Sequence, residues 1–189
     1  METLLSLLIG VGLSAACGFR VFVPLLVVSI AAKAGHLSLA PGLDWIASDA
    51  ALAAFAVATV LEIAAYYVPW LDNALDSIAS PAAVIAGTII TAAVVTDVSP
   101  LLRWSLAFIA GGGAAGIVQA STVLVRGASS AGTVGLANPA VATAELGGSL
   151  VTSALSLWVP VVAIALAGLL AFVVFRKLWP RVSRTHFFR

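Results

Sequence analysis

Long apolar stretches recur along the chain and restrict its fold more than any other feature of the sequence. Six such segments can be marked, over residues 4–32, 50–68, 81–96, 101–125, 139–157 and 158–176. A run of about 18 or more apolar residues can cross the hydrocarbon core of a bilayer, which is roughly 30 Å thick. Only 9% of the 189 residues are charged, against roughly 25% in a soluble domain. The sequence therefore predicts an all-α, multi-pass membrane bundle of about six transmembrane helices, forming one domain over residues 1–189.

Tryptophan residues support the boundaries of these segments. Tryptophan prefers the level of the lipid headgroups, because its ring is apolar while its N–H needs a polar partner. Pro160, two residues after Trp158, favours a tight hairpin between the last two segments, since proline suits a first helical turn. One long bent helix is the alternative at this joint. The five tryptophans at or near segment edges are Trp45, Trp70, Trp104, Trp158 and Trp179.

Lysine and arginine residues predict the orientation. With six spans, both termini lie on one side, together with the 69–80 and 126–138 connections. That side carries six basic residues against two, Lys33 and Arg103, on the other. Because the side richer in lysine and arginine faces the cytoplasm, both termini are expected in the cytoplasm, with residues 177–189 as a basic tail. The six are Arg126, Arg176, Lys177, Arg181, Arg184 and Arg189.

Three charged residues lie in the interior of the apolar segments, away from their ends: Arg20, Glu62 and Glu145. An arginine or carboxylate facing lipid at the helix centre costs roughly 2.5–3.5 kcal/mol on insertion scales. At about 1.5 Å per residue, all three fall within roughly 8 Å of one another in depth. We therefore expect Arg20 to pair with Glu62, Glu145 or both, either as a polar substrate or ion site or as a structural pair that fixes helix register.

Two features predict irregular helices near the same depth. Pro24 has no N–H to donate to the carbonyl of Arg20, so the first span should kink there. Gly111, Gly112 and Gly113 stand at the centre of the fourth span. These glycines either allow close helix packing or unwind the helix, as in the discontinuous helices of many transporters.

A further polar group lies between the second and third spans, in "PWLDNALDSIASP". Asp72 and Asp76 are four residues apart, so on a helix they share one face. Their carboxylates could bind a hard cation such as Mg²⁺ or Ca²⁺, take up protons or contact a lipid headgroup; a solvated turn is the alternative. Gln119, in a partly polar stripe of the fourth span, could line an entry path to the same side.

The remaining composition excludes several functions. Cys17 is the single cysteine, and the two histidines are far apart in sequence, so a usual zinc or haem site is not expected. A net charge of +1 gives no basic footprint for nucleic acid. No cofactor is therefore expected, and the residues favour a role other than catalysis.

Four stretches together carry a family resemblance: "CGFRVFVPLL", "EIAAYYVPWLDNALDSIASPAAVIAGT", "LLRWSLAFIAGGGAAG" and "GLANPAVATAELGG". On these motifs the chain resembles the bacterial integral membrane proteins grouped as domain of unknown function 4126, over nearly its whole length. The resemblance implies a compact, multi-pass protein of the bacterial inner membrane. It implies no activity, substrate or catalytic residue.

Three functions follow from the residues. The leading hypothesis is a small transporter or channel-like protein, able to form homo-oligomers, in which Arg20, Glu62 and Glu145 bind a small ion or anionic solute. Asp72 and Asp76 would then lie at the cytoplasmic mouth. The first alternative is a structural or assembly protein whose buried charges only hold helices together. The second is a lipid-handling or lipid-modifying protein that uses Asp72 and Asp76.

Overall fold

A computed structural model describes residues 2–65, 69–133 and 136–185, with side chains except those of 69–77 and 178–185. Every regular element in this part of the chain is a helix, so the predicted all-α bundle is confirmed. The elements in order are α1 (Glu2–Cys17), α2 (Phe22–Lys33), the 3-10 helix η1 (Asp44–Ala47), α3 (Asp49–Ala65), α4 (Pro69–Val94), α5 (Pro100–Leu106), the π-helix η2 (Ala107–Gly112), α6 (Gly113–Thr133), α7 (Asn138–Trp158) and α8 (Pro160–Thr185).

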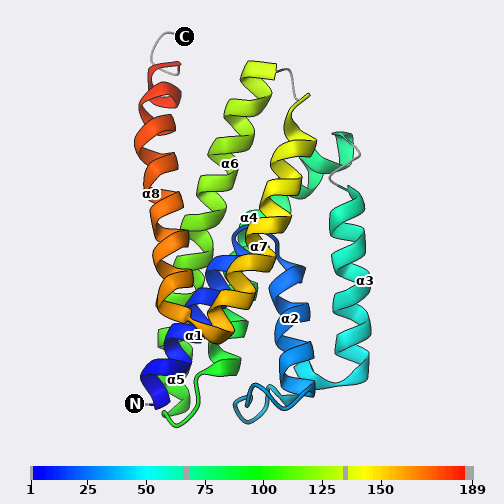
Figure 1. Ribbon diagram of the computed structural model, residues 1–189, viewed down its shortest axis with the longest axis vertical. Coiled ribbons are helices and arrows are strands. Elements are labelled where there is room, and N and C mark those ends of the chain that lie inside the picture. Colours follow the sequence, from blue (N-terminus) through cyan, green and yellow to red (C-terminus); the bar gives the residue numbers. More distant parts are fainter. Residues whose placement is uncertain (1, 66–68, 134–135, 186–189) are drawn as a thin grey trace.

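The first apolar segment is not one continuous span. It forms two short helices, α1 and α2, separated by residues 18–21. Figure 1 shows α1 rising from one end of the bundle to its middle and α2 returning to the same end. Both helices are apolar but shorter than a membrane span. We call α1, residues 18–21 and α2 the re-entrant hairpin. The predicted kink at Pro24 is thus replaced by a complete break a few residues earlier, with a reversal of direction.

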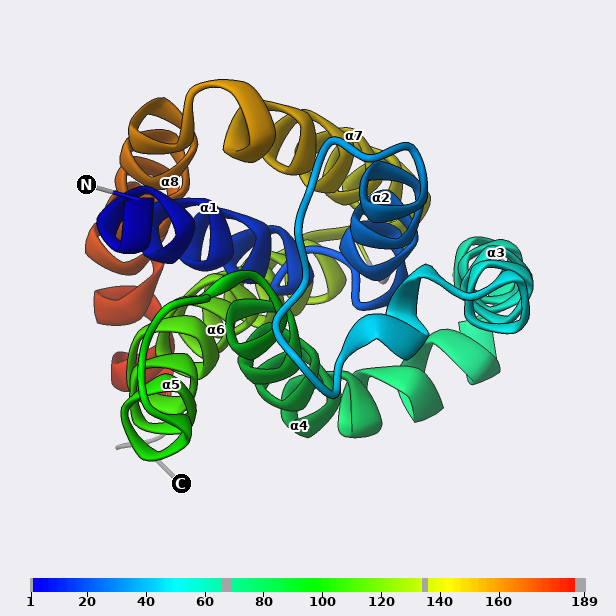
Figure 2. The same ribbon diagram turned by 90° about the horizontal axis from the view of Figure 1, so that it is seen from below.

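The other long helices alternate in direction along the bundle. They are α3, α4, the continuous α5–η2–α6 unit, α7 and α8, and Figure 2 shows several of their connections at one end. Three stretches are long and apolar enough to cross a membrane: Pro100–Thr133, Asn138–Trp158 and Pro160–Lys177. Because α8 begins two residues after α7 ends and runs back along it, the joint at Pro160 is a hairpin and not one bent helix.

The re-entrant hairpin changes the expected topology. The chain makes five long passages where six were predicted, so the start of α1 and the end of α8 lie at opposite ends of the bundle (Figure 1). The prediction that both termini share one side therefore does not match the structure. The end of α3, the start of α4, the end of α6 and the start of α7 lie at the same end of the bundle as the end of α8 (Figure 1). Residues 69–80 and 126–133, predicted as parts of connections, belong to the helices α4 and α6.

The outer surface is strongly apolar, as a lipid-facing surface requires. Soluble monomers rarely expose apolar patches larger than a few hundred Å², but here large apolar side chains are exposed on several helices. Trp45, Trp104 and Trp158 are also exposed. Their positions in η1, in α5 and at the end of α7 lie at the same end of the bundle (Figure 1). Further examples on α3, η2, α6, α7 and α8 are Val57, Val60, Leu61, Phe108, Ile109, Ile117, Leu150, Val151, Leu169 and Phe172.

Small residues bring α1, α4 and the α5–η2–α6 unit into close contact. A Cβ added at Gly111 would lie 2.8 Å from the carbonyl oxygen of Gly87. Ser14 donates a hydrogen bond to that same oxygen, at 2.6 Å, and its hydroxyl lies 2.7 Å from the hydroxyl of Thr91. Gly111 and Gly112 end the π-helix η2, and the helix continues through Gly113. The glycines therefore widen this helix and let it pack closely, but they do not unwind it.

Candidate functional site

The tip of the re-entrant hairpin lies against α6. Residues 18–21 lie outside both helices. The amides of Gly18, Phe19 and Arg20 still bond back to carbonyl oxygens in the last turn of α1. The carbonyl oxygen of Ala16 also accepts a hydrogen bond from Ser149 of α7, at 3.1 Å. A Cβ at Gly18 would lie 2.5 Å from the carbonyl oxygen of Ala115. Only glycine fits at this contact, which places the break in direct contact with the backbone of α6.

Pro24 explains why the chain breaks here. Inside a continuous helix, its ring would clash with the carbonyl four residues earlier and remove one hydrogen bond. In the structure Val21 is the N-cap of α2, so Pro24 is its third residue. An amide in the first turn has no partner within its helix, so proline costs nothing there. The sequence signal for the break is therefore Gly18 and Pro24 together.

Glu62 of α3 provides the hydrogen-bond acceptors that the start of α2 lacks. Its Oε1 accepts from the amide of Val21 at 2.8 Å, and its Oε2 accepts from the amide of Phe22 at 3.1 Å. The side chain is 8% exposed. A carboxylate at a helix N-terminus also interacts favourably with the helix dipole. Glu62 thus stabilises the hairpin tip through main-chain groups, whereas the sequence suggested an ion pair with Arg20.

Replacing Glu62 with alanine is expected to destabilise the protein by about 1–3 kcal/mol, because two buried amides lose their acceptors. The loss should be smaller for Glu62→Gln, whose side-chain carbonyl still accepts one hydrogen bond. Thermal unfolding of the purified variants in detergent measures both changes. Equal stability of wild type and Glu62→Ala would show that the carboxylate does not cap α2.

Three charged side chains meet at the hairpin tip, one from the tip itself and one each from α6 and α7. Arg126 of α6 makes a two-pronged contact with Glu145 of α7: Nε donates to Oε1 at 2.9 Å, and Nη2 donates to Oε2. Arg20 donates from Nη2 to the carbonyl oxygen of Ala142 at 2.6 Å, and this nitrogen lies 3.6 Å from Oε2 of Glu145. All three side chains are less than a tenth exposed. We call Arg20, Arg126, Glu145 and Glu62 the charge cluster.

The structure brings some predicted site residues together and separates others. Arg20 and Glu145 meet as the sequence suggested, whereas Arg126, which sequence reasoning placed in a connection, is an additional member of the cluster. Gln119 is buried on α6, and its backbone nitrogen would lie 2.8 Å from a Cβ at Gly18. Asp72 and Asp76 lie on α4, but their side chains are outside the described residues.

Comparison with known proteins gives one family match, which covers most of the chain. The family model described as "Domain of unknown function (DUF4126)" matches residues 7–180. The chain belongs to this DUF4126 family. No curated protein and no solved structure matches it. The match includes all four members of the charge cluster and the whole break between α1 and α2.

A hollow of about 360 Å³ adjoins the charge cluster in this DUF4126 chain. Glu145 forms part of its wall, together with Phe19 of the hairpin tip. The other lining residues come from α6, α7 and α8, and are Ser121, Thr122, Val125, Val141, Ala144, Gly148, Leu170 and Val174. We call this space the lateral hollow. It is a mainly apolar space with a charged group on one wall.

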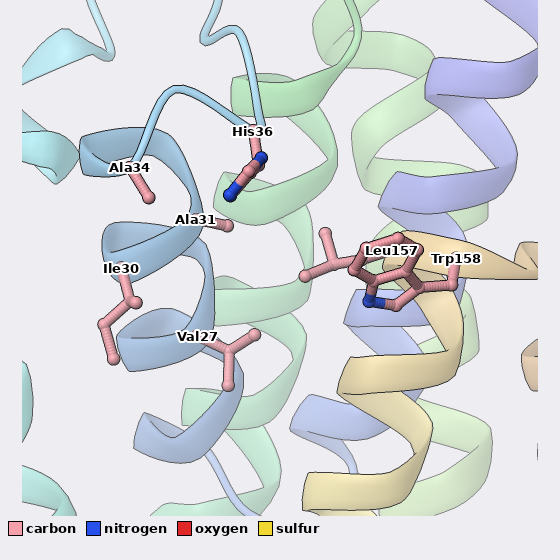
Figure 3. A pocket seen from close by; sticks show the side chains of 7 residues that line it. All are labelled: Val27, Ile30, Ala31, Ala34, His36, Leu157 and Trp158. Carbon is pink, nitrogen blue, oxygen red and sulfur yellow. The ribbon is translucent and has the colours of Figure 1, made fainter.

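A second hollow, of similar size, lies between α2 and the end of α7 (Figure 3). His36 and Trp158 reach towards it from the loop after α2 and from the end of α7, and its other lining residues are apolar. It contains no member of the charge cluster. Over the stretches that the structure describes, no group of three or more His, Cys, Asp and Glu side chains could hold a metal ion.

Proposed function

We propose that this multi-pass membrane protein is a small transporter or channel-like protein in which the charge cluster binds a small ion or anionic solute. The observation that carries the proposal is the broken helix whose tip meets buried charges from three other helices near the middle of the bundle (Figure 1). Asp72 and Asp76, on the helix after the α3–α4 connection, would contribute at the mouth of the pathway.

General membrane physics supports this reading. Non-helical backbone at membrane depth is tolerated only where protein buries it or where it lines a cavity. Ionisable residues within membrane proteins are costly, and they commonly mark ion or substrate pathways. Broken helices supply free main-chain groups to the binding sites of many transporters. Arg20 and Glu62 are buried ionisable residues at the break between α1 and α2, so a broken helix and buried charges occur at the same place.

A structural role is the second candidate, and one observation favours it. Both carboxylate oxygens of Glu145 accept from Arg126, and both of Glu62 accept from main-chain amides of the hairpin tip. Such mutual pairing is also what a cluster that only fixes helix positions would show. Loss of transport with retained folding in a cluster variant separates the two candidates. A lipid-handling role through Asp72 and Asp76 is the third candidate.

We further propose a bacterial inner-membrane location with the C-terminal end in the cytoplasm. The end of the bundle at which α8 terminates carries Arg176 and Lys177, followed in sequence by three more arginines. The opposite end of the bundle has Lys33 and Arg103. The positive-inside rule then orients the bundle. Because of the re-entrant hairpin, this orientation places Glu2 on the outer side.

Flux through reconstituted protein tests the proposed function. Proteoliposomes on a solid-supported membrane are exposed to gradients of potassium, sodium, chloride, acetate and phosphate, and the charge displaced is recorded. We expect a current with at least one gradient, and its loss in Arg20→Met and Glu145→Gln. Lys33→Met is the matched control, because Lys33 pairs with Asp49 at the exposed surface.

Folding must be measured alongside, by the unfolding midpoint in detergent. Wild-type currents in both cluster variants would contradict the proposal, and so would the absence of current in the wild type under every gradient. Loss of current only in variants that also fail to fold would favour the structural role.

A further inference from the structure

The second hollow lies at the end of the bundle where α2 and α7 both end (Figures 1 and 3). We call it the outer hollow. His36 and Trp158 reach towards it, and its other lining residues are apolar. No carboxylate is among the described residues that line it. Its volume of about 360 Å³ leaves ample room for a small solute.

A row of residues on α7 leads from the outer hollow to the charge cluster. Leu157 lines the outer hollow. Ser153, Ser149 and Glu145 follow it at intervals of four residues, towards the middle of the bundle, and all three are buried. Residues four apart share one face of a helix, so these side chains form a line about 18 Å long. We call these four residues the α7 row.

The α7 row faces the re-entrant hairpin. Ser149 donates a hydrogen bond to the carbonyl oxygen of Ala16, in the last turn of α1, at 3.1 Å. The hydroxyl oxygen of Ser156 would lie 2.5 Å from a Cβ at Gly12 of α1. Ser153 stands four residues after Ser149 and three before Ser156, so it shares their face of α7. Its side chain is therefore directed towards the hairpin as well.

The hydroxyl of Ser153 differs from those of its neighbours on this face. Ser149 donates across the interface, and Ser156 donates to the carbonyl oxygen of Thr152 at 2.6 Å. The side chain of Ser153 is completely buried, and its hydroxyl has no hydrogen-bond partner among the described residues. A buried hydroxyl without a partner is costly, and such groups commonly mark the place of a water molecule or an ion. The α7 row thus contains a hydrogen-bonding group that a solute can use.

The polar groups along this route favour an anion. The indole N–H of Trp158 can only donate, and the hydroxyl of Ser153 has a hydrogen to donate. At the inner end of the row, both carboxylate oxygens of Glu145 already accept from Arg126, and Arg20 lies 3.6 Å away. A cation would have to displace Arg126 from this carboxylate, whereas an anion would meet two guanidinium groups, which are strong donors to anions.

We infer that a small monovalent anion reaches the charge cluster from the outer hollow along the α7 row, with the Ser153 hydroxyl donating a hydrogen bond to it on the way. The inference rests on the proposed transport function, and it names the substrate class and the entrance of that same site. Because Ser149 and Ser153 are completely buried, the re-entrant hairpin has to move away from α7 for the anion to pass.

Thiol modification tests the entrance and the class of solute without any measurement of transport. Ser153→Cys is made in a Cys17→Ala background and treated with membrane-impermeant methanethiosulfonates that carry either a sulfonate or a trimethylammonium group. The reagents are added on the side from which Ser38→Cys, at an exposed position after α2, reacts. We expect Ser153→Cys to react. The ratio of the sulfonate rate to the trimethylammonium rate should be about tenfold higher there than at Ser38→Cys, because a region of positive potential concentrates anions.

Ser14→Cys is the matched control. Ser14 is also completely buried, but its hydroxyl is bonded to Gly87 and Thr91 of α4, away from the α7 row. This cysteine should stay unreactive towards both reagents. Ser149→Cys, one turn deeper in the row, replaces Ser153→Cys if that variant does not fold.

Currents from the proteoliposomes then connect the entrance to transport. Modification of Ser153→Cys should abolish the current driven by chloride or acetate, and the same treatment should leave the current of the Cys17→Ala background unchanged. A folded Ser153→Cys that is unreactive, or that favours the trimethylammonium reagent, would overturn the inference. A current that follows potassium or sodium but neither anion would overturn it too. Absence of current under every gradient would instead contradict the proposed function, and the thiol reaction would still decide whether the outer hollow opens to the α7 row.

Discussion

Replacing Arg126 with methionine is expected to lower the free energy of unfolding by about 3–5 kcal/mol, because it leaves the carboxylate of Glu145 buried without its main partner. Arg126 makes both short contacts to that carboxylate, whereas Arg20 lies 3.6 Å away. Reversible unfolding in mixed micelles, followed by circular dichroism, measures the change. Methionine retains most of the apolar stem, so the effect reports on the charge.

A second substitution separates the ion pair from local packing. The double variant Arg126→Met/Glu145→Gln should regain more than half of the lost stability, because the buried charge is gone while the glutamine carbonyl can still accept from Arg20. The exposed pair of Lys33 and Asp49 gives the comparison, since exposed ion pairs contribute about 0–1 kcal/mol. Equal stability losses in Lys33→Met and Arg126→Met would contradict the assigned role of the buried pair.

Replacing Gly18 with leucine is expected to destabilise the protein by about 3 kcal/mol, because added volume in a packed interface forces the backbone apart. Even a Cβ at this position would lie 2.5 Å from both the carbonyl oxygen of Ala115 and the Cβ of Val118. The contact is with backbone and with the branch point of a side chain, so rotation of a side chain cannot relieve it. The hairpin tip would have to move away from α6.

Gly113→Leu is the matched control for Gly18→Leu. A Cβ at Gly113 meets nothing within 4 Å, and leucine is a better helix former than glycine by up to about 1 kcal/mol. This control should therefore be as stable as the wild type or more stable. Unfolding midpoints measured in the same detergent compare the two variants, and a Gly18→Leu variant as stable as Gly113→Leu would disprove the close approach.

The helical bundle could be predicted from the sequence because hydropathy and segment length determine membrane helices directly. Each apolar segment after residue 48 corresponds to one helix or helical unit, but α4 begins at Pro69, twelve residues before the predicted segment, and α6 and α8 continue beyond the predicted ends. The reversal within residues 4–32 could not be predicted in this way, because an apolar segment has the same hydropathy whether it crosses the bilayer or turns back halfway. Gly18 and Pro24 carried the signal, but Pro24 was interpreted as a kink and Gly18 was not singled out.

The candidate site was partly visible for similar reasons. Arg20 and Glu145 could be paired from their depths alone, since a buried arginine needs a carboxylate. Arg126 was missed because it stands one residue past a predicted span, where a basic residue usually marks a loop. The partners of Glu62 could not be foreseen either, because the amides of Val21 and Phe22 become available only once the helix is known to break.

The central claim is that residues 4–32 form a re-entrant hairpin. The most direct test is to measure on which side of the membrane each end of the hairpin lies. Cys17 is the single cysteine, so Cys17→Ala gives a background free of thiols. Single cysteines are then placed at Glu2, Ser38 and Leu136, and labelled with a membrane-impermeant maleimide in right-side-out and inverted vesicles. The structure predicts that Glu2→Cys and Ser38→Cys react from one side and Leu136→Cys from the other. Labelling of positions 2 and 38 from opposite sides would mean that residues 4–32 cross the membrane, and would contradict the account.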